Sequence, residues 1–140
     1  IVNRLQLALL NEAARMLEEG VASPRDIENG IRLSIGLRLP FFGPFGSSDF
    51  AASKMTLLST LEYLAEQIGP QFAPTDRLRD MVARGDIGFL AGRGWLDYSR
   101  YDDRGREMAL KRRNELIARL IRFLKEEGVL EEPFYDYSAP

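Results

Sequence analysis

Few side chains in this sequence could do chemistry, because the 140 residues include no histidine and no cysteine. The commonest general base, the commonest nucleophile and the commonest ligands of transition metals are therefore missing. We expect no metal site and no disulfide bond. Either the protein is not an enzyme, or its catalytic base lies on a part that this sequence does not include.

Asn3 is the first candidate, because it stands where a helix should begin. An asparagine in this place can cap the helix by accepting hydrogen bonds from its first backbone N–H groups. It can also present its amide to a ligand, since a neutral amide at a helix N-terminus holds a polarised oxygen without itself titrating. The residue alone leaves both interpretations open.

Two further patterns could bind anions. Gly92 and Gly94 are two residues apart, as in some phosphate-binding loops, but no predicted strand precedes them and no glycine-rich segment follows, so this indication is weak. The last predicted helix carries a basic face. A solvated helix surface is the ordinary explanation for such a face, and an anion site is the alternative. Its residues are Lys111, Arg112, Arg113, Arg119, Arg122 and Lys125.

Apolar residues spaced three and four apart predict five helices, and no strand pattern accompanies them. The fold class is therefore all-α. We expect the first helix to form the core of the domain and to end at Gly20, Ser23 to cap the second, Ser47 to Asp49 to cap the third, and Thr75 to cap the fourth. The predicted helices cover residues 1–19, 23–36, 47–68, 75–84 and 102–127.

Two segments between the helices are rich in aromatic residues and glycine. Residues 37–46 contain two prolines, two glycines and three phenylalanines, so we expect an irregular segment with one fixed shape that forms the wall of a pocket or an interface. Residues 92–98 predict a turn that returns Trp95 and Tyr98 to the body of the domain.

Composition bounds the class of protein. A chain of 140 residues is long enough for one domain, residues 1–140, with its own core. Nineteen basic residues nearly balance twenty-one acidic ones, which argues against binding to nucleic acid. No apolar run approaches the length of a membrane span and no signal peptide is visible. We expect a cytoplasmic protein without a membrane partner.

Four motifs, in order along the chain, resemble the C-terminal domain of the 3-hydroxyacyl-CoA dehydrogenase family. They are Ile-Val-Asn-Arg-Leu-Gln at residues 1–6, Glu-Glu-Gly-Val-Ala-Ser at 18–23, Gly-Pro-Phe at 43–45, and Gly-Arg-Gly-Trp-Leu-Asp-Tyr at 92–98. The resemblance covers residues 1 to about 98 and implies the helical fold of that domain, which is also like the C-terminal domain of 6-phosphogluconate dehydrogenase.

Enzymes of that family join an N-terminal Rossmann domain, which binds NAD and carries the histidine base, to a helical domain that closes the substrate cleft and forms a homodimer. The resemblance implies that the Rossmann domain is absent here, that this chain holds no cofactor of its own, and that in isolation it is inactive. Asn3 matches the family's motif asparagine. The resemblance therefore implies a catalytic role for Asn3 beside the substrate oxygen.

The sequence departs from the acyl-CoA enzymes at Arg38 and in the long basic helix after residue 102. Both features are similar to the branch that oxidises free 3-hydroxy acids, the L-gulonate dehydrogenase, lambda-crystallin and carnitine dehydrogenase group. A guanidinium can hold a free carboxylate with two parallel hydrogen bonds, which a thioester cannot accept. Arg38 is thus a substrate-binding candidate, and a surface charge near a helix end is the alternative.

These observations leave three functional hypotheses. The chain is part of an NAD-dependent L-3-hydroxyacyl-CoA dehydrogenase, or of a free 3-hydroxy-acid dehydrogenase, or it is a module for self-association. The aromatic residues of 37–45 and the amphipathic last helix favour the third, because a surface that meets another subunit keeps apolar area outside its own core.

Overall fold

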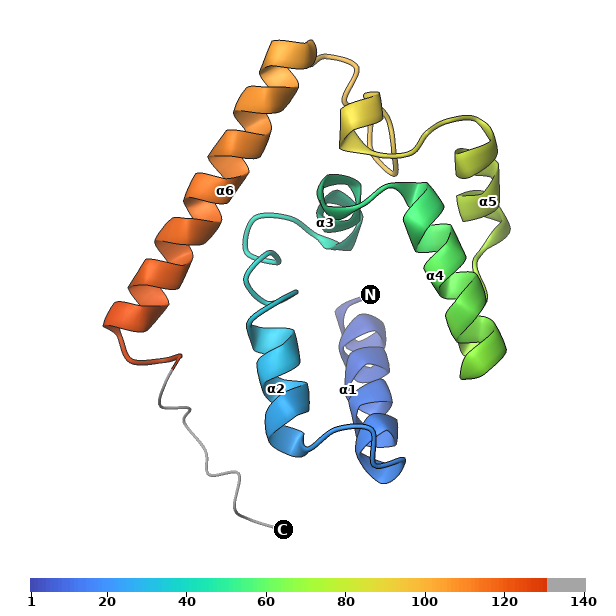
Figure 1. Cartoon of the computed structure of the whole chain (residues 1–140), viewed down its shortest axis with the longest axis vertical. Coiled ribbons are helices and arrows are strands. Elements are labelled where there is room, and N and C mark those ends of the chain that lie inside the picture. The colour runs from blue at the N-terminus through green and yellow to red at the C-terminus, as the bar shows by residue number, and fades with distance from the viewer. Residues whose placement is uncertain (131–140) are drawn as a thin grey trace. The chain divides into compact units, whose positions relative to one another are not determined.

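The computed structural model describes residues 1–130, and residues 131–140 lie outside that description. The described part is all-α, as expected, and its backbone forms isolated β-bridges but no strand. It contains six α-helices rather than five (Figure 1). They are α1 (Val2–Glu18), α2 (Pro24–Arg32), α3 (Pro44–Ala51), α4 (Lys54–Gln67), α5 (Asp76–Ala83) and α6 (Asp103–Glu126), with 3-10 turns at Pro70–Phe72 (η1) and Phe89–Ala91 (η2).

The sixth helix arises because the helix expected over 47–68 is two helices. Ala52 has an extended backbone, with φ of −150° and ψ of 158°, which ends α3. Ser53 then caps α4 by accepting a hydrogen bond from the Met55 N–H at 3.2 Å. The caps expected at Ser47 to Asp49 are therefore wrong. Helix α3 begins earlier, at Pro44, where a proline suits the first helical position, so residues 44–46 are helical rather than irregular.

The second helix also ends before its predicted boundary. Helix α2 stops at Arg32, and residues 33–41 form turns. Gly36 donates its N–H to the Ile31 carbonyl at 2.8 Å, and a Cβ at Gly36 would lie 2.8 Å from the Arg32 carbonyl oxygen. Gly36 is thus required by close backbone approach after the helix rather than as its terminator. The caps predicted at Ser23 and Thr75 are confirmed.

The described chain groups into two compact units, unit 1 with residues 1–37 and 120–130, and unit 2 with residues 38–119. Unit 1 contains the α1–α2 hairpin, whose helices enclose an apolar cavity of about 270 Å³. Neither helix holds a buried residue, so the expectation that the first helix forms the core is wrong. The single-domain organisation over 1–140 stays a prediction.

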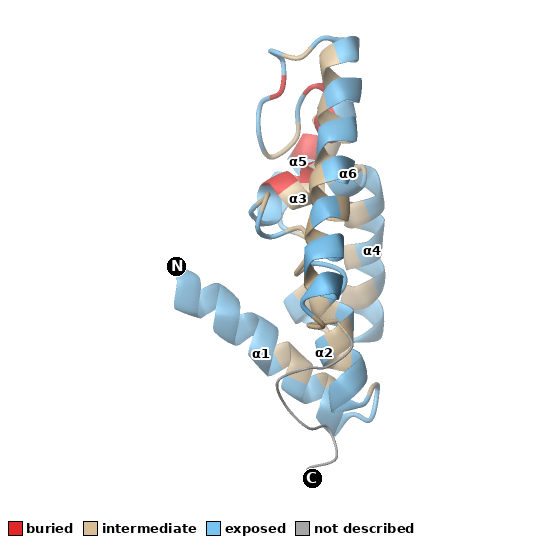
Figure 2. Cartoon of the chain, turned by 90° about the vertical axis from the view of Figure 1, so that its left-hand side faces the viewer, coloured by how far each residue is buried: buried red, intermediate tan, exposed pale blue. Residues whose placement is uncertain are grey.

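Unit 2 contains the buried core (Figure 2). Helices α4 and α5 pack against each other, and α5 contributes two almost fully buried side chains, Leu78 and Met81. Phe89 of η2 and Tyr98 of the following turn complete the core. The apolar spacing predicted for 75–84 is thus confirmed, and the core sits where α5 meets the segment 86–98. No helix among the described residues is both long enough and apolar enough to span a bilayer.

Candidate functional site

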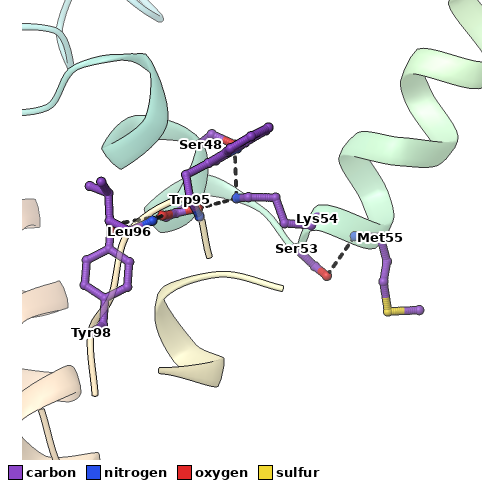
Figure 3. A network of polar contacts seen from close by, with 8 residues as sticks. Ser48, Ser53, Lys54, Met55, Trp95, Leu96 and Tyr98 are labelled. Atoms are coloured by element: carbon purple, nitrogen blue, oxygen red, sulfur yellow. Dashed lines mark hydrogen bonds and ion pairs between the residues drawn. The ribbon is translucent and has the colours of Figure 1, made fainter. Parts of the chain in front are cut away.

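A buried carboxylate in α3 organises unit 2. The two oxygens of Asp49 form one ion pair and accept three hydrogen bonds (Figure 3). Oδ1 pairs with Lys54 Nζ at 2.5 Å and accepts from the Trp95 N–H at 3.1 Å, and Oδ2 accepts from the Leu96 N–H at 3.0 Å and from the Tyr98 hydroxyl at 3.1 Å. We call this arrangement the Asp49 network. It joins three segments that are up to 49 positions apart in sequence.

Lys54 supplies the positive charge that the buried carboxylate needs. Both side chains of the Asp49–Lys54 pair are fully buried, and Lys54 Nζ donates a further hydrogen bond to Ser48 Oγ at 3.2 Å. Burying a carboxylate without a counter-charge costs roughly several kcal/mol of solvation free energy. The break between α3 and α4 makes the pairing possible, because Lys54 opens α4 only five positions after Asp49.

Two glycines allow the chain to approach Asp49 closely. A Cβ at Gly94 would lie 2.3 Å from Asp49 Oδ1, closer than atoms can come without one of them moving. Gly88 has a φ of +135°, and a Cβ there would lie 3.0 Å from the Asp49 carbonyl oxygen. These contacts explain Gly88 and Gly94, two of the three glycines of the 86–94 segment. Gly94 allows the Trp95 and Leu96 N–H groups to donate to the Asp49 carboxylate, so it does not belong to a phosphate-binding loop.

Tyr98 closes the network from the aromatic side. Burial raises the pKa of the Tyr98 phenol above its ordinary value, and the negative charge of Asp49 raises that pKa further. The hydroxyl therefore stays protonated and donates to Asp49 Oδ2. The ring packs edge-on against Phe89 at 5.0 Å and Phe50 at 5.7 Å between centroids.

The other aromatic side chain of the turn also returns to the body, as predicted. Trp95 stacks on Phe45 of α3 with ring centroids 4.8 Å apart. Phe50 stacks on Phe89 at 4.0 Å, and Phe42 lies 4.8 Å from Phe50. Aromatic residues of 37–46 and of 86–98 thus contact one another around α3 in two groups, Phe45 with Trp95, and Phe42, Phe50, Phe89 and Tyr98.

The Asp49 network is built to hold structure rather than to transfer protons. Four donors fill the acceptor positions that a carboxylate offers, and Lys54 is closed off from solvent. The Asp49–Lys54 pair was not predicted from the sequence, since Asp49 was expected to belong to a helix cap. The available signal was the three-residue stretch Ala51-Ala52-Ser53, in which Ser53 is a good N-cap for a new helix.

Asn3 lies in the first turn of α1, in unit 1, and its residue is exposed. It is not the helix cap, because the N-cap position belongs to Ile1, where no side chain makes a capping bond. Among residues 1–130 the Asn3 side chain has no hydrogen-bond partner. Its amide is therefore available to a ligand, although its catalytic role stays a prediction.

Arg38 opens unit 2 and lines a cavity. Its carbonyl oxygen accepts hydrogen bonds from the N–H groups of Phe41 and Phe42, both at 3.0 Å, which fixes the turn before α3. Its side chain borders a cavity of about 270 Å³ that Arg113 of α6 also lines. The expectation that residues 37–46 wall a pocket is confirmed by this cavity, whereas contact of Arg38 with substrate stays a prediction.

The described residues do not fit a dinucleotide cofactor or a metal ion. A dinucleotide site of the Rossmann type needs strands that lead into a glycine-rich turn, and no strand is present in residues 1–130. The N–H groups of Trp95 and Leu96, which follow Gly94, are already used by Asp49. The same part of the chain contains no group of three or more side chains of the metal-binding types.

Comparison with known proteins gives a family match over the first 98 residues. Residues 1–98 match the family described as "3-hydroxyacyl-CoA dehydrogenase, C-terminal domain". The match ends at Tyr98, the residue that completes the Asp49 network.

Curated relatives agree. The chain is 42% identical over 86 residues to the fatty acid oxidation complex subunit alpha of Shewanella loihica, covering 61% of this chain and 12% of that protein. It is 36% identical over 99 residues to a probable 3-hydroxybutyryl-CoA dehydrogenase of Bacillus subtilis, covering 70% and 33%. The chain therefore spans a third or less of the length of these relatives.

A solved structure extends the likeness beyond residue 98. The crystal structure of a 3-hydroxyacyl-CoA dehydrogenase from Archaeoglobus fulgidus superposes with a TM-score of 0.74 at 31% identity, covering 89% of this chain and 42% of that one. Because the family match covers most of the chain and the fold agrees, the protein belongs to the family of 3-hydroxyacyl-CoA dehydrogenase C-terminal domains.

Proposed function

We propose that the chain serves as the C-terminal domain of an NAD-dependent L-3-hydroxyacyl-CoA dehydrogenase, where it closes the substrate cleft and forms the dimer. The observation that carries the proposal is the family match over residues 1–98, which includes Asn3. The dehydrogenation needs a cofactor that takes the hydride from the hydroxyl-bearing carbon and a base that takes the hydroxyl proton. The base would come from the N-terminal Rossmann domain, because this chain contains no histidine. The cofactor would be bound by the same domain, because residues 1–130 contain no strand for a Rossmann-type site.

The part assigned to this chain is to position the substrate. The Asn3 amide, at the N-terminal end of α1 and without a partner in residues 1–130, would donate a hydrogen bond to the substrate oxygen as charge develops on it. Helix α1 also supplies apolar area for contact with the Rossmann domain or a second subunit. Its exposed large apolar residues are Val2, Leu5, Leu7, Leu9, Leu10 and Leu17.

The site proposal is tested in a dehydrogenase that carries this chain as its C-terminal domain. Asn3→Ala should lower kcat on 3-hydroxybutyryl-CoA about a hundredfold, the usual effect of losing one donor to a developing oxyanion. The melting temperature should stay within about 1 °C, because Asn3 is not the cap of α1. Asn11→Ala, on the same helix, is the matched control. An unchanged kcat in folded Asn3→Ala would remove Asn3 from the active site.

A second candidate function changes the substrate to a free 3-hydroxy acid, such as L-gulonate or carnitine. It is favoured by the position of Arg38 on a cavity that holds a second arginine. The test compares 3-hydroxybutyryl-CoA with L-gulonate and carnitine in the wild type and in Arg38→Ala. Activity on a free acid that is lost in Arg38→Ala supports this candidate, whereas activity on the thioester alone, unchanged by Arg38→Ala, refutes it.

The dimer role is tested on the chain itself, and it also covers the hypothesis of a self-association module. Sedimentation at several concentrations should show a dimer that weakens when Leu5 and Leu9 of α1 are both replaced by glutamine, because these side chains are exposed. A monomer at every concentration would contradict the dimer role. The cytoplasmic location stays a prediction.

A further inference from the structure

The α1–α2 hairpin of unit 1 holds an apolar cavity of about 270 Å³ between its two helices. Among residues 1–130, the lining of this cavity comes from the hairpin alone. Neither helix contains a buried residue, so the apolar side chains that face the cavity are only partly covered. Covering such a surface lowers the free energy of the chain. The apolar lining residues are Leu9, Ala13, Met16, Ala22, Ile27 and Ile31.

The described part of the chain ends beside this cavity. Helix α6 ends at Glu126, and Gly128 follows with a φ of +70°. The Val129 carbonyl oxygen then accepts a hydrogen bond from Arg32 Nη2 at 2.6 Å. Arg32 is the residue after Ile31, which lines the cavity. Residues 131–140 therefore start next to the α2 side of the cavity.

The composition of residues 131–140 suits an apolar cavity with a few acidic groups. Phe134, Tyr135 and Tyr137 are three aromatic residues within four positions, and each ring can bury a large apolar area. The two charged residues of the cavity wall, Glu12 and Asp26, are both acidic. A tyrosine hydroxyl can donate a hydrogen bond to such a carboxylate while its ring stays against apolar side chains.

The chain is long enough for these rings to reach the cavity. Phe134 is five positions after Val129, so an extended chain carries it up to about 16 Å from there. The cavity follows α1 from Leu9 to Met16, which is about 10 Å of helix. A covalent link of this length also gives the rings an effective concentration of about 1 mM at the cavity. A second copy or a free partner at ordinary protein concentrations is far more dilute.

We propose that residues 133–137 fold back onto their own chain and cover the cavity between α1 and α2. The ring of Phe134 contacts the apolar side chains of Leu9 and Ile31, and the tyrosine rings follow toward the Met16 end. The contact lies within unit 1. It goes beyond the proposed function and does not require that the chain take part in dehydrogenation.

Nuclear Overhauser effects in the 140-residue chain test the contact directly. We expect effects between the ring protons of Phe134 and the methyl protons of Leu9 and Ile31. A sample that mixes isotope-labelled with unlabelled chains separates contacts within one chain from contacts between two copies. The proposal requires that the effects arise within one chain.

Hydrogen exchange measures how much the contact contributes to the stability of the hairpin. In a variant that combines Phe134→Ser, Tyr135→Ser and Tyr137→Ser, the amides of α1 and α2 should exchange about fivefold faster or more. The amides of α5, in unit 2, should exchange as in the wild type. The matched control combines Glu131→Gln and Glu132→Gln, which changes the same segment but keeps its rings, and it should exchange as the wild type does.

A double-mutant comparison locates the rings at the cavity. Ile27→Ala should accelerate exchange in the hairpin less in the serine variant than in the wild type, because the serine variant has already lost the rings that Ile27 contacts. Leu7→Ala is the control on α1, since Leu7 does not line this cavity. Its effect should be the same in both backgrounds.

Three results would overturn the proposal. The first is an absence of Overhauser effects between the rings and the cavity methyl groups. The second is effects that arise only between labelled and unlabelled chains, which would make a second copy the occupant. The third is hairpin exchange that is equal in the serine variant and in the wild type. None of these results bears on the proposed dehydrogenase role, because none of them measures turnover.

Discussion

Unit 1 and unit 2 contain helices with the same apolar spacing, but these side chains are buried in unit 2 and exposed in unit 1. Both contain helices with apolar residues three and four apart. In unit 2 this pattern in α5 gives Leu78 at 2% and Met81 at 3% exposure. In unit 1 the equally regular pattern of α1 leaves Leu5 at 58% and Leu9 at 44% exposure. An apolar stripe therefore predicts which face of a helix needs cover, but not that its own chain supplies it.

The difference between the units lies in what holds the segments together. Unit 2 has a buried carboxylate that receives donors from two other segments, and its aromatic side chains pack around the same helix. The long-range hydrogen bond that unit 1 shows in its described residues is from Arg32 Nη2 to the Val129 carbonyl, at 2.6 Å. We expect substitutions in unit 2 to be costly and equivalent ones in unit 1 to be mild.

The largest effect is expected at the buried ion pair. Asp49→Ala leaves Lys54 buried without its counter-charge and removes the acceptor of two backbone N–H groups, so the free energy of unfolding should fall by about 3–5 kcal/mol. Urea unfolding followed by circular dichroism measures it. Glu62→Ala, which removes an ion pair with both side chains 47% exposed, should cost less than about 1 kcal/mol. Similar losses in the two variants would contradict the assigned role of the Asp49 network.

The next effect compares one substitution in both units. Leu78→Ala should lower the free energy of unfolding by about 2–5 kcal/mol, because it opens a cavity in the core. Leu5→Ala should change it by no more than about 0.5 kcal/mol, because Leu5 is already exposed. Both values come from urea unfolding at low protein concentration, where association does not contribute. A large loss in Leu5→Ala would show that the chain covers α1 itself.

Replacing each of two glycines by alanine should give smaller changes in stability, with opposite signs. Gly94→Ala brings a Cβ against Asp49 Oδ1 and should destabilise the chain by about 1–3 kcal/mol. Gly30→Ala, inside α2, meets nothing within 4 Å and should stabilise it by up to about 1 kcal/mol. Thermal melting measures both. A stable Gly94→Ala protein would mean that the 92–98 turn has room to move.

The smallest effect is a pH dependence in unit 2. Because the pKa of Tyr98 is raised in the folded chain, its contribution is fully present below the unfolded pKa of about 10 and is lost as the pH rises above it. Wild-type stability should therefore fall from about pH 9 upward, and Tyr98→Phe should fall less steeply. Tyr63→Phe, at an exposed position, should follow the wild type. Parallel profiles of all three proteins would contradict burial of the Tyr98 hydroxyl.

Local signals predicted much of the fold. The all-α class, the caps at Ser23 and Thr75 and the stop at Gly20 depend on short-range geometry, and the structure has each of them. The break at Ala52 was missed because Asp49 was taken for a cap, although Ser53 offered a local signal for a new helix. The role of Asp49 itself had no local signal, because three of its donors lie 46 to 49 positions away.

The candidate site was harder to predict. That Arg38 borders a pocket could be expected from the proline- and phenylalanine-rich segment around it. That Arg113 faces the same cavity could not be expected, because Lys111, Arg112 and Arg113 are three consecutive cations in a basic helix and the sequence does not distinguish them. Which of three consecutive cations turns inward is decided by the Phe50 carbonyl, a contact across 63 positions.

The position of Trp95 also makes it an internal fluorescence probe. It is the only tryptophan of the 140 residues, its backbone N–H donates to Asp49 Oδ1, and its ring stacks on Phe45. Opening of the Asp49 network must change the surroundings of this indole, whereas unfolding of α1 and α2 alone removes no contact that it makes within unit 2. The fluorescence of the native protein therefore reports on unit 2, and circular dichroism reports on both units, so any difference between the two unfolding curves measures how independently they melt.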